Sequence, residues 1–249
     1  MLYVFRLGRS KDIKWPSYII MLEMLIVVCG LPATGKSTLA KHLAIDLGGE
    51  ILRTDIIRRE LFKDASLKEV LESKDPMRYD LERIFDRQKA IPEKYQRMIW
   101  RQKEMVYDEL LKRVERLLKK GTNVILDGTF YKRNLRDRIY SLSRRMKTRT
   151  YLIECRCSEA AVKKRVAGRR KIRDEASNVD KMRIYYIVKK AYESPLSDPV
   201  PIILFDTYQE KFEIRNSELG GEDLHRIVES IGRFVQRFST SAPRTLCSS

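Results

Sequence analysis

Gly30-Leu-Pro-Ala-Thr-Gly-Lys-Ser-Thr38 fits the phosphate-binding pattern G-x-x-x-x-G-K-[ST] from Gly30 to Ser37. In this pattern the glycines let the backbone turn, so that successive N–H groups point at phosphate oxygens. The lysine adds a positive charge near the β- and γ-phosphates, and the serine hydroxyl is a ligand for Mg²⁺. The predicted nucleotide-binding residues are therefore Gly30, Leu31, Pro32, Ala33, Thr34, Gly35, Lys36, Ser37 and Thr38.

The residues on either side of this loop supply the structural context that the pattern requires. Residues 24–29 are a short apolar run rich in β-branched side chains, which predicts a buried strand. Residues 37–47 carry leucines at helical spacing, and Gly48 and Gly49 follow as a helix stop. The order strand, loop, helix indicates a nucleotide-binding loop rather than a chance run of glycines.

The remainder of the chain alternates between predicted strands and predicted helices. Residues 63–90 are charged and poorly periodic, so we expect an irregular, partly helical insertion there. Alternation implies right-handed crossovers and a three-layer α/β fold with a five-stranded parallel sheet covered by helices on both faces. Beyond the first strand and helix, the expected strands are 50–53, 123–128, 150–156 and 201–205, and the expected helices are 54–62, 92–120, 134–146, 158–167, 177–192 and 221–238.

The predicted domain occupies residues 21–238, with a basic lid at about 165–178. We expect residues 1–20 to lie outside the core, either as an extension before a native start at Met21 or Met24 or as a mobile arm. Residues 239–249 are polar and are expected to form a disordered tail.

Composition narrows the class of protein. The 249 residues carry a net charge of +17, which favours anionic partners such as nucleic acid, although surface networks of Lys, Arg and Glu are also typical of thermophilic proteins. Four cysteines do not form a disulfide framework or a zinc pattern, which indicates reduced thiols in a cytoplasmic protein. The apolar stretch 18–29 is too short to span a membrane and contains Glu23.

Asp127 ends a predicted strand as Val-Ile-Leu-Asp, the usual place of the carboxylate that holds the Mg²⁺ shell in phosphate-loop proteins. The next residue is Gly128, whereas many ATPases that drive motion have a glutamate there to orient water. This difference favours phosphoryl transfer to another acceptor. The alternative is an ordinary aspartate that accepts backbone hydrogen bonds at a strand end.

Asp55 lies at the end of the second predicted strand, and strand ends line the ligand crevice of a doubly wound sheet. A carboxylate there can hold an attacking hydroxyl in line with the γ-phosphate and accept its proton. Arg58 and Arg59 follow on the next helix, where one of them could bind an anionic group of the acceptor. The alternative role for Asp55 is to stabilise the helix dipole.

Two basic segments complete the set of candidates. The helix 132–147 begins beside the crevice, so Thr129 and Arg133 are candidate substrate-binding residues, with a plain solvated surface as an equal alternative. The second segment would cover the ATP site as a lid and neutralise charge on the transferring phosphate. Its basic residues are Lys163, Lys164, Arg165, Arg169, Arg170, Lys171 and Arg173.

Taken together, the segments 30–40, 52–61, 124–130 and 152–156 with the lid arginines resemble the P-loop kinases described as AAA family ATPases. These kinases are similar to the kinase domain of phage polynucleotide kinase and to seryl-tRNA kinase, and more distantly to gluconate kinase and zeta toxins. The resemblance covers about residues 24–206. It implies that Lys36 and Ser37 act on ATP and Mg²⁺, that Asp55 activates the acceptor hydroxyl, that Arg58 is on the substrate side, and that Arg169 stabilises the transition state.

The sequence thus predicts an ATP- and Mg²⁺-dependent phosphotransferase, with Lys36, Asp55 and Arg169 as catalytic residues and Ser37 and Asp127 as metal ligands. The charge makes RNA or DNA the first candidate acceptor, through a 5′-hydroxyl or a tRNA-linked hydroxyl, with a small metabolite close behind. The alternative from another class is a regulatory or binding protein that hydrolyses ATP, which needs neither Asp55 nor a lid. The acceptor and the oligomeric state stay open.

Overall fold

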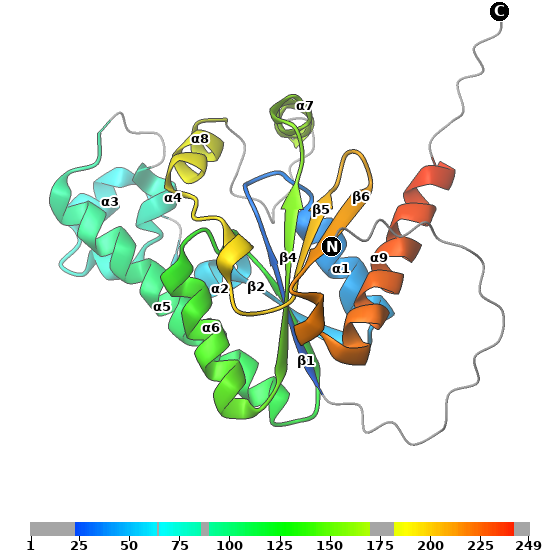
Figure 1. Ribbon diagram of the computed structural model, residues 1–249. Coiled ribbons are helices and arrows are strands. Elements are labelled where there is room, and N and C mark those ends of the chain that lie inside the picture. The colour runs from blue at the N-terminus through cyan, green and yellow to red at the C-terminus, as the bar shows by residue number, and fades with distance from the viewer. Residues whose placement is uncertain (1–22, 64, 86–89, 170–181, 242–249) are drawn as a thin grey trace, which may run out of the picture.

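The computed structural model describes residues 23–63, 65–85, 90–169 and 182–241, and these form a sheet between two layers of helices (Figure 1). The sheet order is β2-β3-β1-β4-β5-β6. The five strands β1 to β5 are parallel, and β6 pairs with β5 in the antiparallel direction. The strands are β1 (Met24–Cys29), β2 (Gly49–Arg53), β3 (Asn123–Asp127), β4 (Arg149–Arg156), β5 (Ile202–Asp206) and β6 (Lys211–Arg215).

The long helices follow the strands and return the chain for the next parallel strand. The α-helices are α1 (Lys36–Asp46), α2 (Thr54–Leu61), α3 (Leu67–Glu72), α4 (Leu81–Phe85), α5 (Glu93–Leu118), α6 (Arg133–Met146), α7 (Glu159–Arg169), α8 (Met182–Ala191) and α9 (Gly221–Ser241). The short 3₁₀ turns within the described ranges are η1 (Pro76–Arg78), η2 (Pro195–Ser197) and η3 (Ser217–Leu219).

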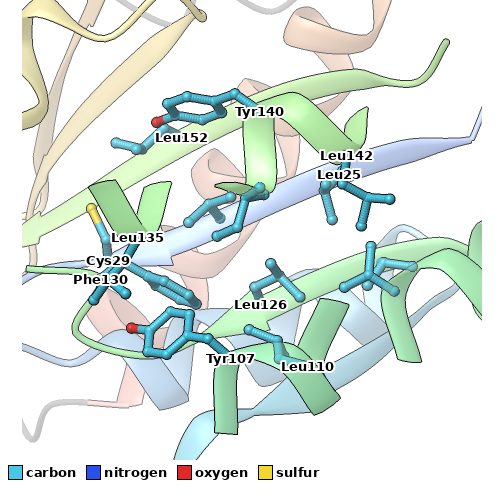
Figure 2. Close-up of a cluster of buried hydrophobic side chains, with 14 of the residues drawn as sticks. Leu25, Cys29, Tyr107, Leu110, Leu126, Phe130, Leu135, Tyr140, Leu142 and Leu152 are labelled. Carbon is cyan, nitrogen blue, oxygen red and sulfur yellow. The ribbon is translucent and has the colours of Figure 1, made fainter. Parts of the chain in front are cut away.

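Each face of the sheet has its own apolar core, because successive strand residues point to opposite faces. On one face, Leu25 and Val27 of β1 pack with apolar residues of α2, α5 and α6 (Figure 2). On the other face, Ile26 and Val28 pack against α1 and α9. Burial of both faces explains why the central strands are apolar throughout and do not alternate.

The predicted α/β architecture is confirmed, with one difference in the sheet. The described residues form six strands where five were predicted, because β6 adds an antiparallel edge strand after the turn that follows β5. Residues 63–85 contain the short helices α3 and α4, as expected of a partly helical insertion. In the part of the chain that the structure describes, no helix is long and apolar enough to cross a bilayer.

Some expectations fall on residues that the structure does not describe. The predicted extension 1–20 and the lid residues 170–178 lie outside the described ranges. The first residues of the helix expected at 177–192 lie there too, and the helix is described from Met182 to Ala191. Helix α9 continues to Ser241, three residues into the predicted tail, and residues 242–249 are not described.

Candidate active site

The predicted site residues gather where the parallel strands end. The loop 30–35 follows β1, Asp127 is the last residue of β3, and Asp55 lies just after β2. In the sheet, β3 is the neighbour of both β1 and β2, so the three strand ends are adjacent. The main-chain N–H of Gly30 donates to the carbonyl of Thr129 at 3.3 Å, which joins the loop to the segment after β3.

The loop has the backbone that the phosphate-binding pattern requires. Gly30 and Gly35 have φ angles of 132° and 95°, a region that disfavours any side chain. Ala33 also has a positive φ of 62°, at the position where glycine is commoner in the pattern. An alanine in this left-handed conformation costs about 1 kcal/mol, so the departure from glycine is compatible with the loop.

Lys36 and Thr34 bind the loop from within. The Lys36 Nζ donates to the Leu31 carbonyl at 2.7 Å, and the Thr34 hydroxyl donates to the same oxygen at 2.8 Å. The side chain of Lys36 therefore folds over the loop instead of pointing to solvent. Its charge lies where a phosphate group cradled by the loop would need it.

Two residues that sequence reasoning did not assign to the loop support it from outside. Arg165 of α7 donates from Nη1 to the Ala33 carbonyl at 3.3 Å and to the Thr207 hydroxyl at 2.9 Å. The Thr207 hydroxyl in turn donates to the Thr34 carbonyl at 2.6 Å. Arg165 was predicted as one of many lid cations, and a lone threonine after β5 gives no signal in the sequence.

Arg53, the last residue of β2, joins the two candidate carboxylates. Its Nη2 is 2.9 Å from Asp55 Oδ2, and its Nε is 3.2 Å from Asp127 Oδ2. The Asp127 carboxylate is only 4% exposed, and the Asp55 carboxylate is 25% exposed. A guanidinium presents several donors in a fixed plane and so can hold two carboxylates in one orientation.

The environment of Asp55 suits a group that accepts a proton. Burial raises the pKa of Asp55 above its ordinary value, while the Arg53 charge lowers it and the Asp127 charge raises it. The main-chain N–H of Ile56 donates to Asp55 Oδ1 at 3.0 Å and fixes the side chain. A raised pKa makes the carboxylate a better proton acceptor than a solvated aspartate.

The residues that would hold Mg²⁺ fit the ion. Ser37, in the first turn of α1, supplies a hydroxyl, and Asp127 supplies a buried carboxylate at the end of β3. Oxygen ligands are those that Mg²⁺ prefers, and it commonly takes one or two protein ligands together with substrate phosphates. Among the described residues, no group of three or more His, Cys, Asp or Glu forms a separate metal site.

Arg58 lies one helical turn after Asp55, and its guanidinium already has carboxylate partners. It forms an ion pair with Glu82 of α4 and lies 3.8 Å from the carboxylate of Asp80. Burial lowers the pKa of Arg58, but the Glu82 and Asp80 charges raise it and the net shift is upward. The charge of Arg58, the predicted substrate-side arginine, is thus balanced by carboxylates of the chain itself.

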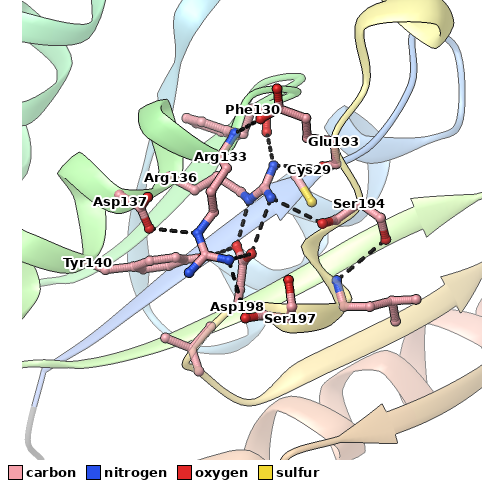
Figure 3. Close-up of polar contacts among 12 residues, drawn as sticks. Cys29, Phe130, Arg133, Arg136, Asp137, Tyr140, Glu193, Ser194, Ser197 and Asp198 are labelled. Carbon is pink, nitrogen blue, oxygen red and sulfur yellow. Dashed lines mark hydrogen bonds and ion pairs between the residues drawn. The ribbon is translucent and has the colours of Figure 1, made fainter.

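Arg133 begins α6 next to the loop after β3 and belongs to a network that is mainly internal (Figure 3). Its guanidinium contacts Asp137 at 2.7 Å and Asp198 at 2.9 Å. Thr129 is half-buried just after the strand, and within the described part of the chain its polar contact is the carbonyl that accepts from Gly30.

Arg136, one turn further along α6, is fully buried at the centre of the same network (Figure 3). It donates to Asp198 Oδ2 at 2.6 Å and to the carbonyls of Phe130 and Glu193 at 2.9 and 3.0 Å. Tyr140 also donates to Asp198, at 2.6 Å. This network fixes the segment between α8 and β5 against the loop that follows β3.

A second buried polar group lies on β4, where Glu154 pairs in register with Cys29 of β1. Glu154 of β4 accepts a hydrogen bond from the Tyr192 hydroxyl at 2.9 Å and pairs with Arg156 at 2.6 Å. Tyr192 lies just after α8, so this contact ties the end of that helix to the strand beside β1. Sequence reasoning did not single out either residue. Arg169 is the last residue of α7, and its side chain is outside the described part of the structure.

Comparison with known proteins agrees with this geometry. Residues 25–193 match the family AAA_33, described as an AAA domain. The uncharacterised protein Rv2004c of Mycobacterium tuberculosis (strain H37Rv) is 32% identical over 140 residues, which are 54% of this chain and 23% of that protein. The uncharacterised protein Mb2027c of Mycobacterium bovis matches to the same extent. The chain thus matches less than a quarter of the length of these curated relatives.

Solved structures resemble the fold over most of the chain. A candidate kinase from Chloroflexus aurantiacus has a TM-score of 0.51 at 20% identity, over 90% of this chain and all of that one. A sugar kinase from Janibacter has a TM-score of 0.50 at 14% identity, over 88% and 96%. Kti12 of Chaetomium thermophilum, solved with ADP-AlF3, has a TM-score of 0.50 at 16% identity, over 85% and 97%. These likenesses establish a P-loop kinase-like fold.

Proposed function

This chain belongs to the AAA domain family AAA_33, and on that premise we propose that it is an ATP-dependent phosphotransferase acting on a hydroxyl group. One observation carries the proposal. Arg53 connects Asp55 to Asp127 at the ends of two strands adjacent to the phosphate-binding loop. A protein that only bound a nucleotide would not need a second, partly exposed carboxylate fixed at that place.

The roles of the chain's own residues follow from their positions. Loop N–H groups and Lys36 bind the phosphates of ATP, and Ser37 and Asp127 would hold Mg²⁺, which when bound neutralises charge on the phosphate oxygens. Asp55 orients the acceptor hydroxyl and accepts its proton as the γ-phosphate is transferred. Arg53 keeps the two carboxylates in fixed positions. By resemblance, Arg169 at the end of α7 is proposed to stabilise charge on the transferring group.

Two classes of acceptor are candidates within this proposal. The net charge of +17 favours the 5′-hydroxyl of a nucleic acid or a tRNA-linked hydroxyl. Arg58 and Arg133 beside the site already bind carboxylates of the chain. This favours a small acceptor, because the phosphates of a nucleic acid would compete with those carboxylates for the two arginines. The cytoplasm is the proposed location, on the basis of the cysteine usage.

Transfer of γ-³²P from ATP by the purified protein tests the proposal directly. The acceptors are 5′-hydroxyl oligonucleotides, total tRNA and a pool of small hydroxyl compounds, each with and without Mg²⁺. Label in any pool that depends on the protein supports a kinase. Free phosphate alone, with no labelled acceptor, would contradict it and favour an ATP-hydrolysing regulatory protein.

Lys36→Ala removes the charge that lies over the loop, and we expect it to abolish both ATP binding and phosphate transfer. The measurement is binding of a fluorescent ATP analogue alongside the transfer assay. Retained binding and transfer would exclude the loop from the mechanism.

Asp55→Asn keeps the shape of the side chain but removes the proton acceptor. We expect transfer to fall by about 10²-fold or more while ATP binding stays close to that of the unaltered protein. Binding and single-turnover transfer are measured on the same preparation. Unchanged transfer would reduce Asp55 to the role of a helix-terminal residue.

A further inference from the structure

Arg58 and Lys103 form a two-cation clamp beside the proposed position of the acceptor hydroxyl. Arg58 is three residues after Asp55 on α2, so both side chains lie on the same face of that helix. Lys103 of α5 lies within hydrogen-bond distance of the Tyr131 hydroxyl, at 3.5 Å, on the segment that follows β3. The clamp is therefore attached to the same strand ends as the catalytic carboxylates.

The clamp holds a carboxylate of the chain itself. Glu82 of α4 pairs through Oε2 with Arg58 and through Oε1 with Lys103, the latter at 3.2 Å. The two cations are only 14% and 20% exposed, whereas Glu82 is 43% exposed. The Glu82 side chain thus extends from the surface to two cations whose own side chains are largely shielded from water.

The charges of this cluster balance. Asp80 is almost fully buried behind Arg58 at 3.8 Å, so two cations face two carboxylates. Burial acts to raise the pKa of Glu82, but Arg58 and Lys103 lower it to about 2, and Glu82 remains ionised at neutral pH. The cluster formed by Arg58, Lys103, Glu82 and Asp80 therefore carries no net charge although it contains two basic residues.

We propose that Glu82 occupies an anion-binding site formed by Arg58 and Lys103. In this position it makes the active site select acceptors that carry no phosphate next to the reacting hydroxyl. This inference rests on the proposed function and names its acceptor class as polar and uncharged. A phosphate near Asp55 would have to displace Glu82 from two partly buried cations and would meet the repulsion of Asp80. Specificity of this kind comes from a repulsive element as much as from an attractive one.

Binding of inorganic phosphate to protein saturated with Mg²⁺ and AMP-PNP tests the proposal without knowledge of the acceptor. The analogue occupies the phosphate-binding loop, so the added phosphate can bind only at other anion-binding sites of the protein. Glu82→Gln keeps the size of the side chain and removes its charge, and it leaves one oxygen that can accept from only one of the two cations. We expect this variant to bind phosphate at least about tenfold more tightly than the unaltered protein, because two partly buried cations have lost a counter-charge.

Two further variants test whether the measured phosphate binds at Arg58 and Lys103. Addition of Arg58→Gln to Glu82→Gln should remove the gained phosphate affinity. Glu60→Gln is the matched control, since Glu60 lies on the same helix as Arg58 but pairs with Arg113 at 2.6 Å, and it should leave phosphate binding unchanged. Equal phosphate binding by the unaltered protein and Glu82→Gln would overturn the proposal, as would a gain that survives the loss of Arg58.

Transfer assays separate this inference from the proposed function. Acceptor pairs that differ by one phosphate, such as glycerol and glycerol 3-phosphate or uridine and uridine 3′-monophosphate, are compared with each variant. The unaltered protein should favour the uncharged member, and Glu82→Gln should shift the ratio of kcat/KM towards the charged member by about tenfold. A protein that gains the phosphate site in Glu82→Gln but transfers to no acceptor would refute the proposed function alone.

Discussion

At the scale of single residues, Arg53 holds both candidate carboxylates although it is not itself proposed as a catalytic residue. It contacts Asp55 and Asp127 from the end of β2 and is itself only 9% exposed. Burial acts to raise the pKa of Asp55, and the positive charge of Arg53 is the largest influence that favours the ionised form of this proposed proton acceptor.

Gly30 offers a sharp test of the loop. Its φ is 132°, and a methyl group there would clash with the carbonyl oxygen of Cys155, which belongs to the backbone of β4. We expect Gly30→Ala to abolish nucleotide binding and to lower the free energy of unfolding by about 2–4 kcal/mol, since the strand must move or the loop must change shape. Urea unfolding and nucleotide titration measure the two effects.

Gly48→Ala is the control for Gly30→Ala. Gly48 also has a positive φ, 63°, but a methyl group there would meet nothing within 4 Å. We expect a loss of about 1 kcal/mol from backbone strain and unchanged nucleotide binding. If both alanine variants behaved alike, the clash with β4 would not be what excludes side chains from Gly30.

At the scale of elements, one ion pair locks the two helices that cover the second face of the sheet. Asp46, at the end of α1, accepts from Arg233 of α9 through both oxygens, with the shortest distance 2.6 Å. These hydrogen bonds lower the pKa of Asp46 from 3.8 to about 2. The resulting stabilisation is present above about pH 4 and is lost as the pH falls from there towards 2.

We expect Asp46→Asn to lower the free energy of unfolding by about 1 kcal/mol at pH 7 and by much less near pH 2.5. The value is smaller than the full pKa shift implies, because Arg233 is 46% exposed and its charge is screened. Denaturant midpoints at the two pH values measure it. Glu229→Gln, which removes a carboxylate 4.0 Å from the same arginine, should change stability by less than about 0.5 kcal/mol at either pH.

The elements that could be predicted from the sequence are those whose own residues specify the type of element without help from tertiary contacts. The apolar run of β1 and the leucine spacing of α1 each specify one kind of element, and the structure has both. Strand β6 was missed because it is short, charged at both ends and only half-buried, so its pairing with β5 depends on tertiary structure.

The same distinction holds for the candidate site. Loop residues follow from a fixed pattern, and Asp127 and Asp55 follow from their places at strand ends. The partners of these residues do not, since Arg165 and Thr207 reach the loop from segments far along the chain. Arg58 and Glu82 are 24 residues apart in the sequence, and the residues around each of them give no indication that the two side chains pair.

At the scale of the whole molecule, the family match ends at residue 193, but the fold continues beyond it. Strand β5 pairs with β4, and Leu224, Ile227 and Ile231 of α9 belong to the apolar core on the α1 face. The phosphate-binding loop also depends on Thr207, which follows β5. The later segment is therefore part of the nucleotide-binding unit.

We expect a fragment of residues 23–193 to lack cooperative folding, because β4 would become an open edge and the part of the apolar core that α9 covers would be exposed. A fragment of residues 23–241 should fold and bind nucleotide. Circular dichroism during thermal unfolding and gel filtration compare the two. Sharp thermal unfolding of the shorter fragment would show that β5, β6 and α9 are an addition to an independent domain.

The net charge illustrates what composition alone leaves open. A charge of +17 indicates anionic partners, yet several arginines beside the site are bound by carboxylates of the chain. Which cations are left for a ligand depends on the fold, because Asp198 and Glu82 reach these arginines from other elements. The sum of charges could thus be computed from the sequence, and its distribution could not.

The buried network around Arg136 also constrains how this protein can change over evolutionary time. Arg136 and Tyr140 are both buried and both bind Asp198, so the loss of Asp198 leaves a buried guanidinium and a buried hydroxyl without their shared acceptor. Single substitutions at these positions should be purged, whereas a joint replacement by apolar residues of similar volume should survive. Lineages related to this chain are therefore expected to keep all three residues together or to have lost all three together.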